Sequence, residues 1–239
     1  MNKEQFIKAV EELGIKLSPK QLEDLEIYCN FLLETNKHTN LTAIKEKDQV
    51  YLKHFYDSLT IIKALDFNNV NNLIDIGTGA GFPGMVLKII FPNINITLLD
   101  SNNKKISFLQ ELNKKLGYND LNFFHGRAED FCKNHRESFD IVTGRAVSNM
   151  TTLSELCLPL TKINGYFIAL KGSNYEEVEE ALFAIKTLGG NIEQTYSFTL
   201  PVEESERNII KIKKVKATPI QYPRRYEKII KNPLKNYGK

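Results

Sequence analysis

The chain has 239 residues, of which 42% are hydrophobic and 26% are charged, values that exclude a disordered protein and allow one large domain with a full core. Its net charge of +3 is uneven, because residues 207–239 carry eleven Lys or Arg and one acid, whereas residues 1–206 carry 21 basic and 28 acidic residues. The basic tail indicates a polyanionic partner or, equally well, a solvated lysine-rich surface, and the widely spaced cysteines and histidines exclude a zinc site or a disulfide framework.

The amino terminus and the longest apolar runs bear on where the protein acts. The first ten residues, MNKEQFIKAV, carry charges where a signal peptide needs an apolar segment. No run approaches the roughly 18 to 20 apolar residues that span a membrane. We therefore expect a cytoplasmic protein without a membrane partner.

Residues 1–65 have the periodicity of three amphipathic helices. Residues 3–13 form the first, and the second runs from Ser18 and Pro19, an N-cap followed by proline at the first helical position, to about Thr35. In the third helix, apolar residues recur at spacings of three and four. These residues are Leu52, Phe55, Leu59 and Ile62.

From residue 72 the pattern changes to short apolar runs that alternate with helix-like stretches, which is typical of βαβ units and a mainly parallel sheet. The expected strands are residues 73–76, 94–99, 121–124, 139–143 and 165–170. The expected helices between them are residues 83–91, 104–116, 151–158 and 175–188. Two further β-rich runs, residues 193–200 and 208–215, are expected to finish the sheet as a hairpin-like pair.

A glycine-rich turn, D-I-G-T-G-A-G-F-P-G, begins at Asp75 after the first expected strand. Glycines there let the backbone approach a ligand and leave helical N–H groups free to bind it. Residues 79–84 match the G-x-G-x-x-G pattern of dinucleotide-binding proteins, and Asp100 follows about twenty residues later. However, Asp75 two residues before Gly77 resembles the first motif of S-adenosylmethionine-dependent methyltransferases, and Phe82 stands where the dinucleotide pattern counted from Gly77 needs glycine.

Polar turns also follow the next three strands. Asp100 ends the second, where any adenosine ligand presents its ribose diol to a carboxylate. Residues 126–130, G-R-A-E-D, follow the third, and residues 144–147, G-R-A-V, follow the fourth. Ligands of open α/β sheets bind outside the carboxyl ends of the strands, so these turns in succession favour a methyltransferase site.

Together these motifs resemble those of a known family. D-I-G-T-G-A-G-F-P-G, L-D-S-N-N-K-K, G-R-A-E-D, T-G-R-A-V and L-K-G are similar to the successive motifs of the bacterial small-subunit (16S) ribosomal RNA guanine-N7 methyltransferases, historically named the glucose-inhibited division protein B family. The resemblance covers nearly the whole chain and includes residues 36–42, 54–59 and 222–224. The tail departs from it, since R-Y-E-K-I-I-K-N-P-L follows Arg224 where the family usually has a glycine-containing basic stretch.

The resemblance implies an α/β protein of the Rossmann-like class I methyltransferase fold, with an N-terminal helical extension over residues 1–65 and a methyltransferase domain with a basic tail over residues 66–239. It implies S-adenosylmethionine as the cofactor and 16S ribosomal RNA or a small-subunit precursor as the partner, and we expect a monomer. The residues expected to bind the donor are Asp75, Gly79 and Gly81, from the glycine turn itself, and, by similarity to the family, Gly77, Phe82, Asp100, Ser101, Asn102, Ala128, Glu129 and Arg145.

The resemblance also implies the role of each part of the site. Asp100 to Asn102 would surround the ribose, and Ala128 and Glu129 would hold the adenine. Arg145 and Lys171 are the candidate catalytic residues, which would hold an RNA phosphate or the target base.

Several of these residues have simpler interpretations. Asp75 could simply accept the N–H groups of the glycine turn or, equally well, contact the amino group of the donor directly. Arg145 and Lys171 could be ordinary ion-paired residues. His54 could belong to the polar face of the third helix or shape the site. Residues 36–42 could be a plain turn, although the resemblance implies that they close over the donor.

The sequence shows no candidate general base, and none is needed for this acceptor. Guanine N7 has an in-plane lone pair and loses no proton, so positioning and fixed dipoles can carry the reaction. Two alternatives remain open on sequence alone, namely a NAD- or FAD-dependent oxidoreductase and an RNA-binding module that binds S-adenosylmethionine without turnover.

Overall fold

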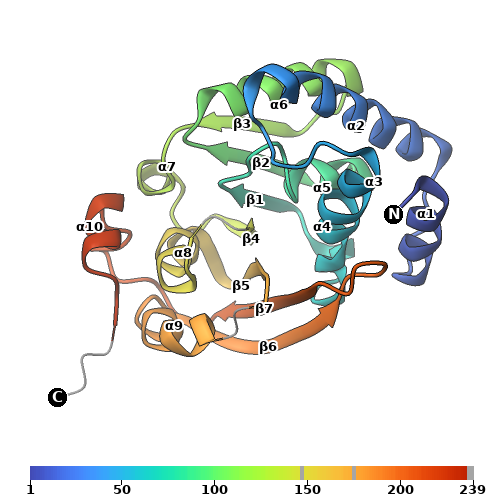
Figure 1. Ribbon diagram of the computed structural model, residues 1–239. Coiled ribbons are helices and arrows are strands. Elements are labelled where there is room, and N and C mark those ends of the chain that lie inside the picture. Colours follow the sequence, from blue (N-terminus) through green and yellow to red (C-terminus); the bar gives the residue numbers. More distant parts are fainter. Residues whose placement is uncertain (146–147, 174–175, 236–239) are drawn as a thin grey trace.

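The computed structural model describes residues 1–145, 148–173 and 176–235. Within them, a seven-stranded sheet is covered by helices on both faces (Figure 1). This confirms the expected α/β class. Ala146 and Val147 of the fourth strand-end motif and Tyr175 at the start of an expected helix lie outside the described residues.

Five parallel strands form the centre and one edge of the sheet. They are β1 (Asn72–Ile76), β2 (Asn95–Asp100), β3 (Leu121–His125), β4 (Phe139–Arg145) and β5 (Thr161–Lys171), paired in the order β3-β2-β1-β4-β5. The order reverses between β1 and β4, and this switch point is where open sheets bind ligands.

The other edge of the sheet is the expected hairpin-like pair, β6 (Gly190–Thr199) and β7 (Glu206–Lys214). β7 lies antiparallel between β5 and β6, so the later strand takes the inner position. Its buried residues Ile209, Ile210 and Ile212 fit an interior strand, whereas β6 after Gly190 has only exposed and half-buried residues, as an edge strand does.

The amino-terminal helices cover one face of the sheet. α1 (Lys3–Glu12) and α2 (Pro19–Thr39) each begin at a capping box. Residues 47–63 form one continuous helical segment, made of α3 (Lys47–Val50), a π-helical turn (Tyr51–Tyr56), α4 (Asp57–Leu59) and a 3₁₀ turn (Thr60–Lys63). The three expected helical segments are confirmed.

These helices share one hydrophobic cluster with α5 (Gly84–Ile90), α6 (Asn103–Leu116) and the strands beneath them. A short 3₁₀ turn (Phe67–Asn69) leads from them into β1. A domain boundary at residue 65 remains a prediction.

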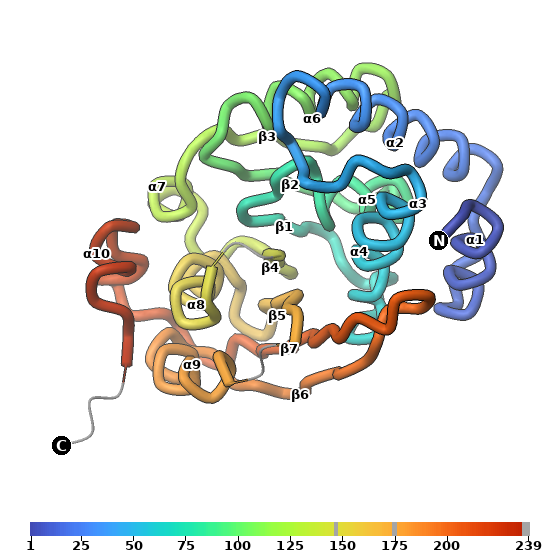
Figure 2. Tube along the Cα trace, in the orientation of Figure 1, coloured from blue at the N-terminus to red at the C-terminus, as the bar shows by residue number. Residues whose placement is uncertain are grey.

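A second hydrophobic cluster fills the other face, under α7 (Ala128–His135), α8 (Met150–Cys157), a 3₁₀ turn (Leu158–Leu160) and α9 (Glu176–Thr187). Figure 2 shows α7, α8 and α9 in sequence along that face. The sequence motif at residues 126–130 predicted only a turn, so α7 was not expected.

Residues 215–235, here called the C-terminal strap, run from the end of β7 back to α8. The strap contains α10 (Tyr226–Lys231), which packs against α8. Arg136 at the end of α7 holds the strap by donating hydrogen bonds to the carbonyls of Thr218 (2.6 Å), Pro219 (3.0 Å) and Tyr222 (2.6 Å). The basic tail therefore follows a fixed course across the protein.

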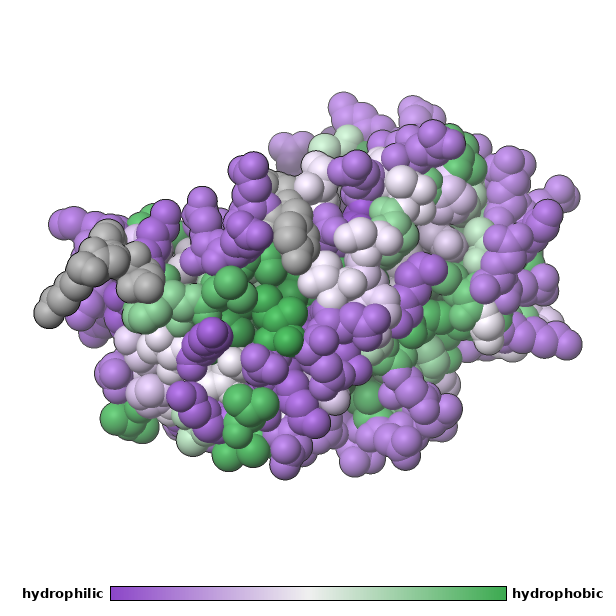
Figure 3. All heavy atoms as spheres, turned by 90° about the horizontal axis from the view of Figure 1, so that it is seen from below, coloured by the Kyte–Doolittle hydropathy of each residue, from purple (hydrophilic) through white to green (hydrophobic). Residues whose placement is uncertain are grey.

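The surface seen from below in Figure 3 is mainly hydrophilic, with apolar side chains in separate groups. Two exposed apolar residues of α9 are Leu182 and Phe183. Over the described residues, no helix combines the length and apolar character needed to cross a membrane.

Candidate active site

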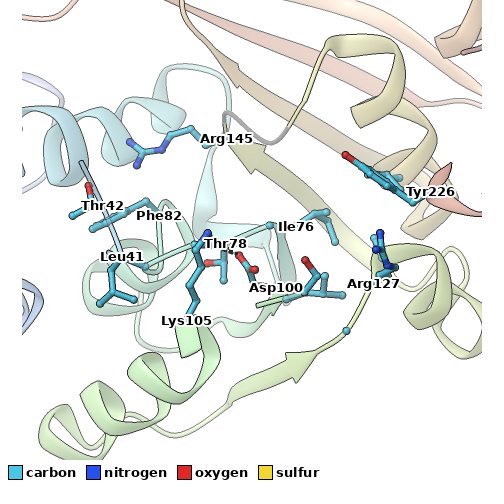
Figure 4. A pocket seen from close by; sticks show the side chains of 18 of the residues that line it. Leu41, Thr42, Ile76, Thr78, Phe82, Asp100, Lys105, Arg127, Arg145 and Tyr226 are labelled. Atoms are coloured by element: carbon cyan, nitrogen blue, oxygen red, sulfur yellow. Dashed lines mark hydrogen bonds and ion pairs between the residues drawn. The ribbon is translucent and has the colours of Figure 1, made fainter. Parts of the chain in front are cut away.

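A cavity of about 570 Å³ opens at the carboxyl ends of β1 to β4 (Figure 4). Its walls come from the turns after these strands, the loop after α2, and α10. Eight residues predicted to bind the donor line it, namely Gly77, Gly79, Phe82, Asp100, Ser101, Ala128, Glu129 and Arg145. Asp75, Gly81 and Asn102 lie outside this lining.

The glycine turn places two glycines in the cavity and one behind it. Gly77 and Gly79 have left-handed backbone, with φ of 65° and 62°. Gly81 is needed for packing, because an added Cβ would lie 2.6 Å from Tyr28 Oη and 2.7 Å from Leu109 Cδ2. The structure thus separates the two glycines that line the cavity from one that lets α2 and α6 approach the turn.

Asp75 is fully buried and stabilises the glycine turn. Its Oδ2 accepts hydrogen bonds from Thr78 Oγ1 (2.7 Å) and from the backbone N–H of Gly84 (2.9 Å), while Oδ1 has no partner among the described residues. Burial raises the pKa of Asp75 to about 7. These contacts match the interpretation that Asp75 accepts the N–H groups of the turn.

Asp100 presents an oriented carboxylate to the cavity. The backbone N–H groups of Gly79 (2.9 Å) and Asn102 (2.8 Å) donate to its two oxygens, and Lys105 Nζ lies 3.8 Å from Oδ2. Each carboxylate oxygen can accept more than one hydrogen bond, so capacity remains for a diol. The side chain of Asn102 instead caps α6 by accepting from the N–H of Lys104.

Glu129 lies at the start of α7 and is only 8% exposed. Its Oε1 accepts a hydrogen bond from the backbone N–H of Tyr226 at 3.0 Å. A residue predicted to hold the adenine is therefore also a contact of the C-terminal strap.

The buried His54 and the partly buried Arg145 form a pair against Phe82. The ring of His54 stacks on that of Phe82, with centroids 4.1 Å apart, and the Arg145 guanidinium lies 5.2 Å from the same ring. Arg145 Nη2 lies 3.0 Å from His54 Nδ1, and Nη1 donates to the carbonyl of Lys53 and to Asp57 Oδ2. Arg145 thus connects the end of β4 to the π-helical turn.

The contacts of His54 fix its protonation. A guanidinium only donates, so Nδ1 accepts from Arg145 and the ring proton lies on Nε2, which donates to Thr42 Oγ1 at 2.8 Å. Burial, with the charge of Arg145 as the second cause, lowers the pKa of His54 to about 3. His54 is therefore neutral near pH 7 and holds Thr42 at the cavity.

Lys171 lies outside the first cavity, in the wall of a second cavity of about 510 Å³. Its Nζ pairs with Glu177 Oε2 (2.8 Å) and donates to the carbonyl of Ser148 (2.8 Å). The two cavities share His54 and Arg145. Both candidate catalytic residues are ion-paired, as the simpler interpretation expected, and both also line a cavity.

The sequence suggested that the basic tail binds a polyanion or is solvated, but the side chain of Arg224 instead pairs with Glu155 inside the protein. Its Nε and Nη2 donate to the two oxygens of Glu155 at 2.8 and 2.6 Å, and its backbone N–H donates to Oε1 at 2.9 Å. Glu155 is fully buried in α8. In this structure Arg224 anchors the strap.

The cavity lining also includes residues that the sequence did not assign to the donor, among them Lys105, Arg127, Leu156 and Tyr226. Arg127 could have been found, because it stands in the G-R-A-E-D motif beside Ala128. Tyr226 belongs to the tail segment that departs from the family pattern, and its local sequence contains no signal that places it near β3.

The protein is similar over nearly its whole length to known methyltransferases. Residues 21–210 match the family model of rRNA small subunit methyltransferase G. The chain is 51% identical over 237 residues to Ribosomal RNA small subunit methyltransferase G of Bacillus subtilis (strain 168), over 98% of this chain and 99% of that relative. The relative of the same name from Oceanobacillus iheyensis is 52% identical, over 98% and 100% of the two chains.

Solved structures share the fold at low sequence identity. TrmN from Thermus thermophilus matches with a TM-score of 0.54 at 14% identity, over 66% of this chain and 48% of that one. TYW2 from M. jannaschii, solved in complex with AdoMet, matches with a TM-score of 0.53 at 15% identity, over 66% and 77% of the two chains. The expected Rossmann-like methyltransferase fold is confirmed, and the oxidoreductase alternative is set aside. With a family match over most of its residues and relatives about half identical over nearly all of it, the chain belongs to the rRNA small subunit methyltransferase G family.

Proposed function

We propose that the protein transfers the methyl group of S-adenosylmethionine to N7 of a guanine in 16S ribosomal RNA. The observation that carries this proposal is the pair of cavities at the carboxyl ends of the strands, which meet at Arg145 and His54. One cavity suits the donor, and the other suits the acceptor base.

The residues of the first cavity fit S-adenosylmethionine. A volume of about 570 Å³ lies within the usual range of small-molecule sites. Gly77 and Gly79 leave space for close backbone approach, and Asp100 offers carboxylate oxygens to the ribose. Glu129 and Ala128 lie at the turn proposed to hold the adenine. The bound donor supplies a methyl group on a positively charged sulfur, which a nucleophilic nitrogen can attack directly.

The second cavity is suited to a base or a phosphate. Asp57 lies between two guanidinium groups, with Oδ2 at 3.2 Å from Arg145 Nη1 and Oδ1 at 3.0 Å from Arg207 Nε, and this fixes both cations at the wall. Arg145 and Lys171 would orient the acceptor. His54 is neutral and accepts from Arg145, so it takes no proton, which agrees with an acceptor nitrogen that loses none.

The reaction can be tested by mapping the modified base. The purified protein is incubated with S-adenosylmethionine and either protein-free 16S ribosomal RNA or small subunits, and N7-methylguanine is located by borohydride reduction and aniline cleavage. We expect one cleavage site. Methyl incorporation at another atom, or none on either substrate, would contradict the proposal.

Arg145→Ala tests the proposed role of the shared residue. It should lower the rate of methyl transfer more than it lowers RNA affinity. Arg145→Lys, which keeps the charge but loses the planar fork, is the matched control for a general loss of charge.

The monomeric state and the cytoplasmic location belong to the same proposal. Light scattering of the purified protein and cell fractionation test them separately.

A further inference from the structure

Tyr226 closes one end of the first cavity. Figure 4 shows Phe82 and Arg145 at one end of this cavity. Tyr226 and Arg127 lie at the other end, with Asp100 between the two. A donor whose ribose meets Asp100 and whose sulfur meets the Arg145 end therefore has its adenine at the Tyr226 end.

The position of Tyr226 is fixed on both sides along the chain. Two residues earlier, Arg224 makes its bidentate pair with the buried Glu155. Three residues later, Ile229 is fully buried in the cluster under α8. Between these anchors, the backbone N–H of Tyr226 donates to Glu129 Oε1 at 3.0 Å. The aromatic ring is thus part of a preformed wall.

The chemistry of this wall suits a purine. The guanidinium of Arg127 lies 5.3 Å from the centre of the Tyr226 ring, so a cation and an aromatic surface occur together at this end. Flat aromatic side chains and guanidinium planes bind nucleobases by stacking. Tyr226 comes from the strap and not from the strand-end turns.

We propose that Tyr226 is a donor-binding residue, which forms part of the adenine pocket and stacks on the adenine of S-adenosylmethionine. This inference rests on the donor-binding part of the proposed function and extends it to the C-terminal strap. The strap is then a component of the cofactor site as well as a basic surface.

Calorimetry with S-adenosylmethionine and with adenosine tests the inference without any turnover. Tyr226→Ala should raise the dissociation constants of both ligands by the same factor, on the order of tenfold. Tyr226→Phe should stay close to wild type, because stacking does not use the hydroxyl. Ile230→Ala, on the same helix at an exposed position, is the matched control and should also bind as wild type. Unchanged affinity in Tyr226→Ala overturns the inference.

A second measurement covers the case in which Tyr226→Ala folds poorly. The chain contains no tryptophan, so Tyr226→Trp introduces a single indole whose emission reports on its own surroundings. Saturating adenosine should quench this emission by stacking, whereas the emission of Ile230→Trp should not change. If the emission of Tyr226→Trp does not change with saturating adenosine or S-adenosylmethionine, the inference is wrong.

The failure of this inference differs from a failure of the proposed function. If the wild-type protein binds no S-adenosylmethionine, the donor assignment itself is wrong. If the wild-type protein binds it and both position-226 tests are negative, only the role of Tyr226 is wrong.

Discussion

Substitution of Gly79 and of Gly117 can distinguish the effect of backbone strain on stability from a direct effect on donor binding. Both have left-handed backbone, with φ of +62° and +76°, and a Cβ on either would meet no protein atom closer than 4.0 Å. Alanine should strain each position by about 1 to 2 kcal/mol. We expect Gly79→Ala and Gly117→Ala to lower thermal stability similarly, and only Gly79→Ala to weaken donor binding in calorimetry. Wild-type donor affinity in Gly79→Ala would remove this glycine from the site.

Asp100 and Asn102 are close together in the same motif, but the structure gives their side chains different roles. Asp100→Ala removes the carboxylate in the cavity and should weaken S-adenosylmethionine binding by about 1 to 3 kcal/mol. Asn102→Ala removes only the cap of α6 and should lower the free energy of unfolding by about 1 kcal/mol with little effect on affinity. Calorimetry and urea unfolding on both variants check this. A similar loss of affinity in both would mean that the Asn102 side chain also contacts the donor.

His54 should make the protein sensitive to acid. Its pKa falls from 6.5 to about 3 on folding, so the unfolded chain takes up a proton first as the pH drops. The stability that depends on neutral His54 is therefore complete above about pH 6.5 and is lost progressively below it, by about 2 kcal/mol at pH 5.

The variant His54→Asn keeps an oxygen near the position of Nδ1 but cannot take up a proton. Its free energy of unfolding, measured with urea at several pH values, should fall less between about pH 7 and pH 5 than that of the wild type. Parallel curves for the two proteins would show that His54 does not titrate in this range.

The positions of individual site residues were predictable from the sequence where they depend on residues close by in the chain. Local motifs were enough to predict that Gly77, Gly79 and Asp100 lie at the cavity, although they did not show that Gly81 lies behind it. The partner of Arg224 and the position of Tyr226 were not predictable, because each depends on a hydrogen bond across a long sequence separation, 69 residues to Glu155 and 97 residues to Glu129. For Asp75, the sequence showed a carboxylate beside the glycine turn, but it could not show that this carboxylate points into the turn and away from the cavity.

At the level of elements, the ion pair of Arg224 with the buried Glu155 is one of the contacts that hold the C-terminal strap. Arg224→Ala leaves Glu155 buried without its partner and should lower the free energy of unfolding by about 3 to 5 kcal/mol. The neighbouring Arg225 is exposed, so Arg225→Ala should change it by no more than about 0.5 kcal/mol. Urea unfolding monitored by circular dichroism compares the two. Equal effects would show that the Glu155 pair does not stabilise the fold.

The strands and most helices were predictable because buried parallel strands and amphipathic helices leave clear periodic patterns. The sequence predicted neither α7 nor α10, which have eight and six residues, because residues 126–130 were interpreted as a polar turn and the tail as a basic surface. The local sequence also does not show that β7, and not β6, pairs with β5, since a hairpin can add to a sheet through either of its strands. The greater burial of β7 identifies it as the inner strand only when its neighbours β5 and β6 are known.

At the scale of the whole molecule, RNA binding should depend on the exposed cations of the strap. Arg225→Ala combined with Lys228→Ala should weaken RNA binding, because each cation that neutralises a phosphate releases counterions. The salt dependence should become shallower by about 0.7 to 0.9 unit for each phosphate that the variant no longer neutralises. S-adenosylmethionine affinity should not change.

The control removes the same number of charges on the other side of the molecule. Lys8→Ala with Lys16→Ala alters exposed residues in and just after α1, which lies across the sheet from α10 (Figure 1). If filter binding over a range of salt concentrations gives the same slope for both double variants and the wild type, the strap is only a solvated basic surface.

The two cavities have a common wall, because Arg145 and His54 line both. A ligand on one side that moves or polarises this pair also changes the free energy of binding on the other side. By thermodynamic linkage, the two effects must be equal. If the bound donor changes the affinity for the acceptor by some factor, the bound acceptor changes the affinity for the donor by the same factor. Replacing His54 should therefore alter these two factors together, even though its ring need not touch the RNA.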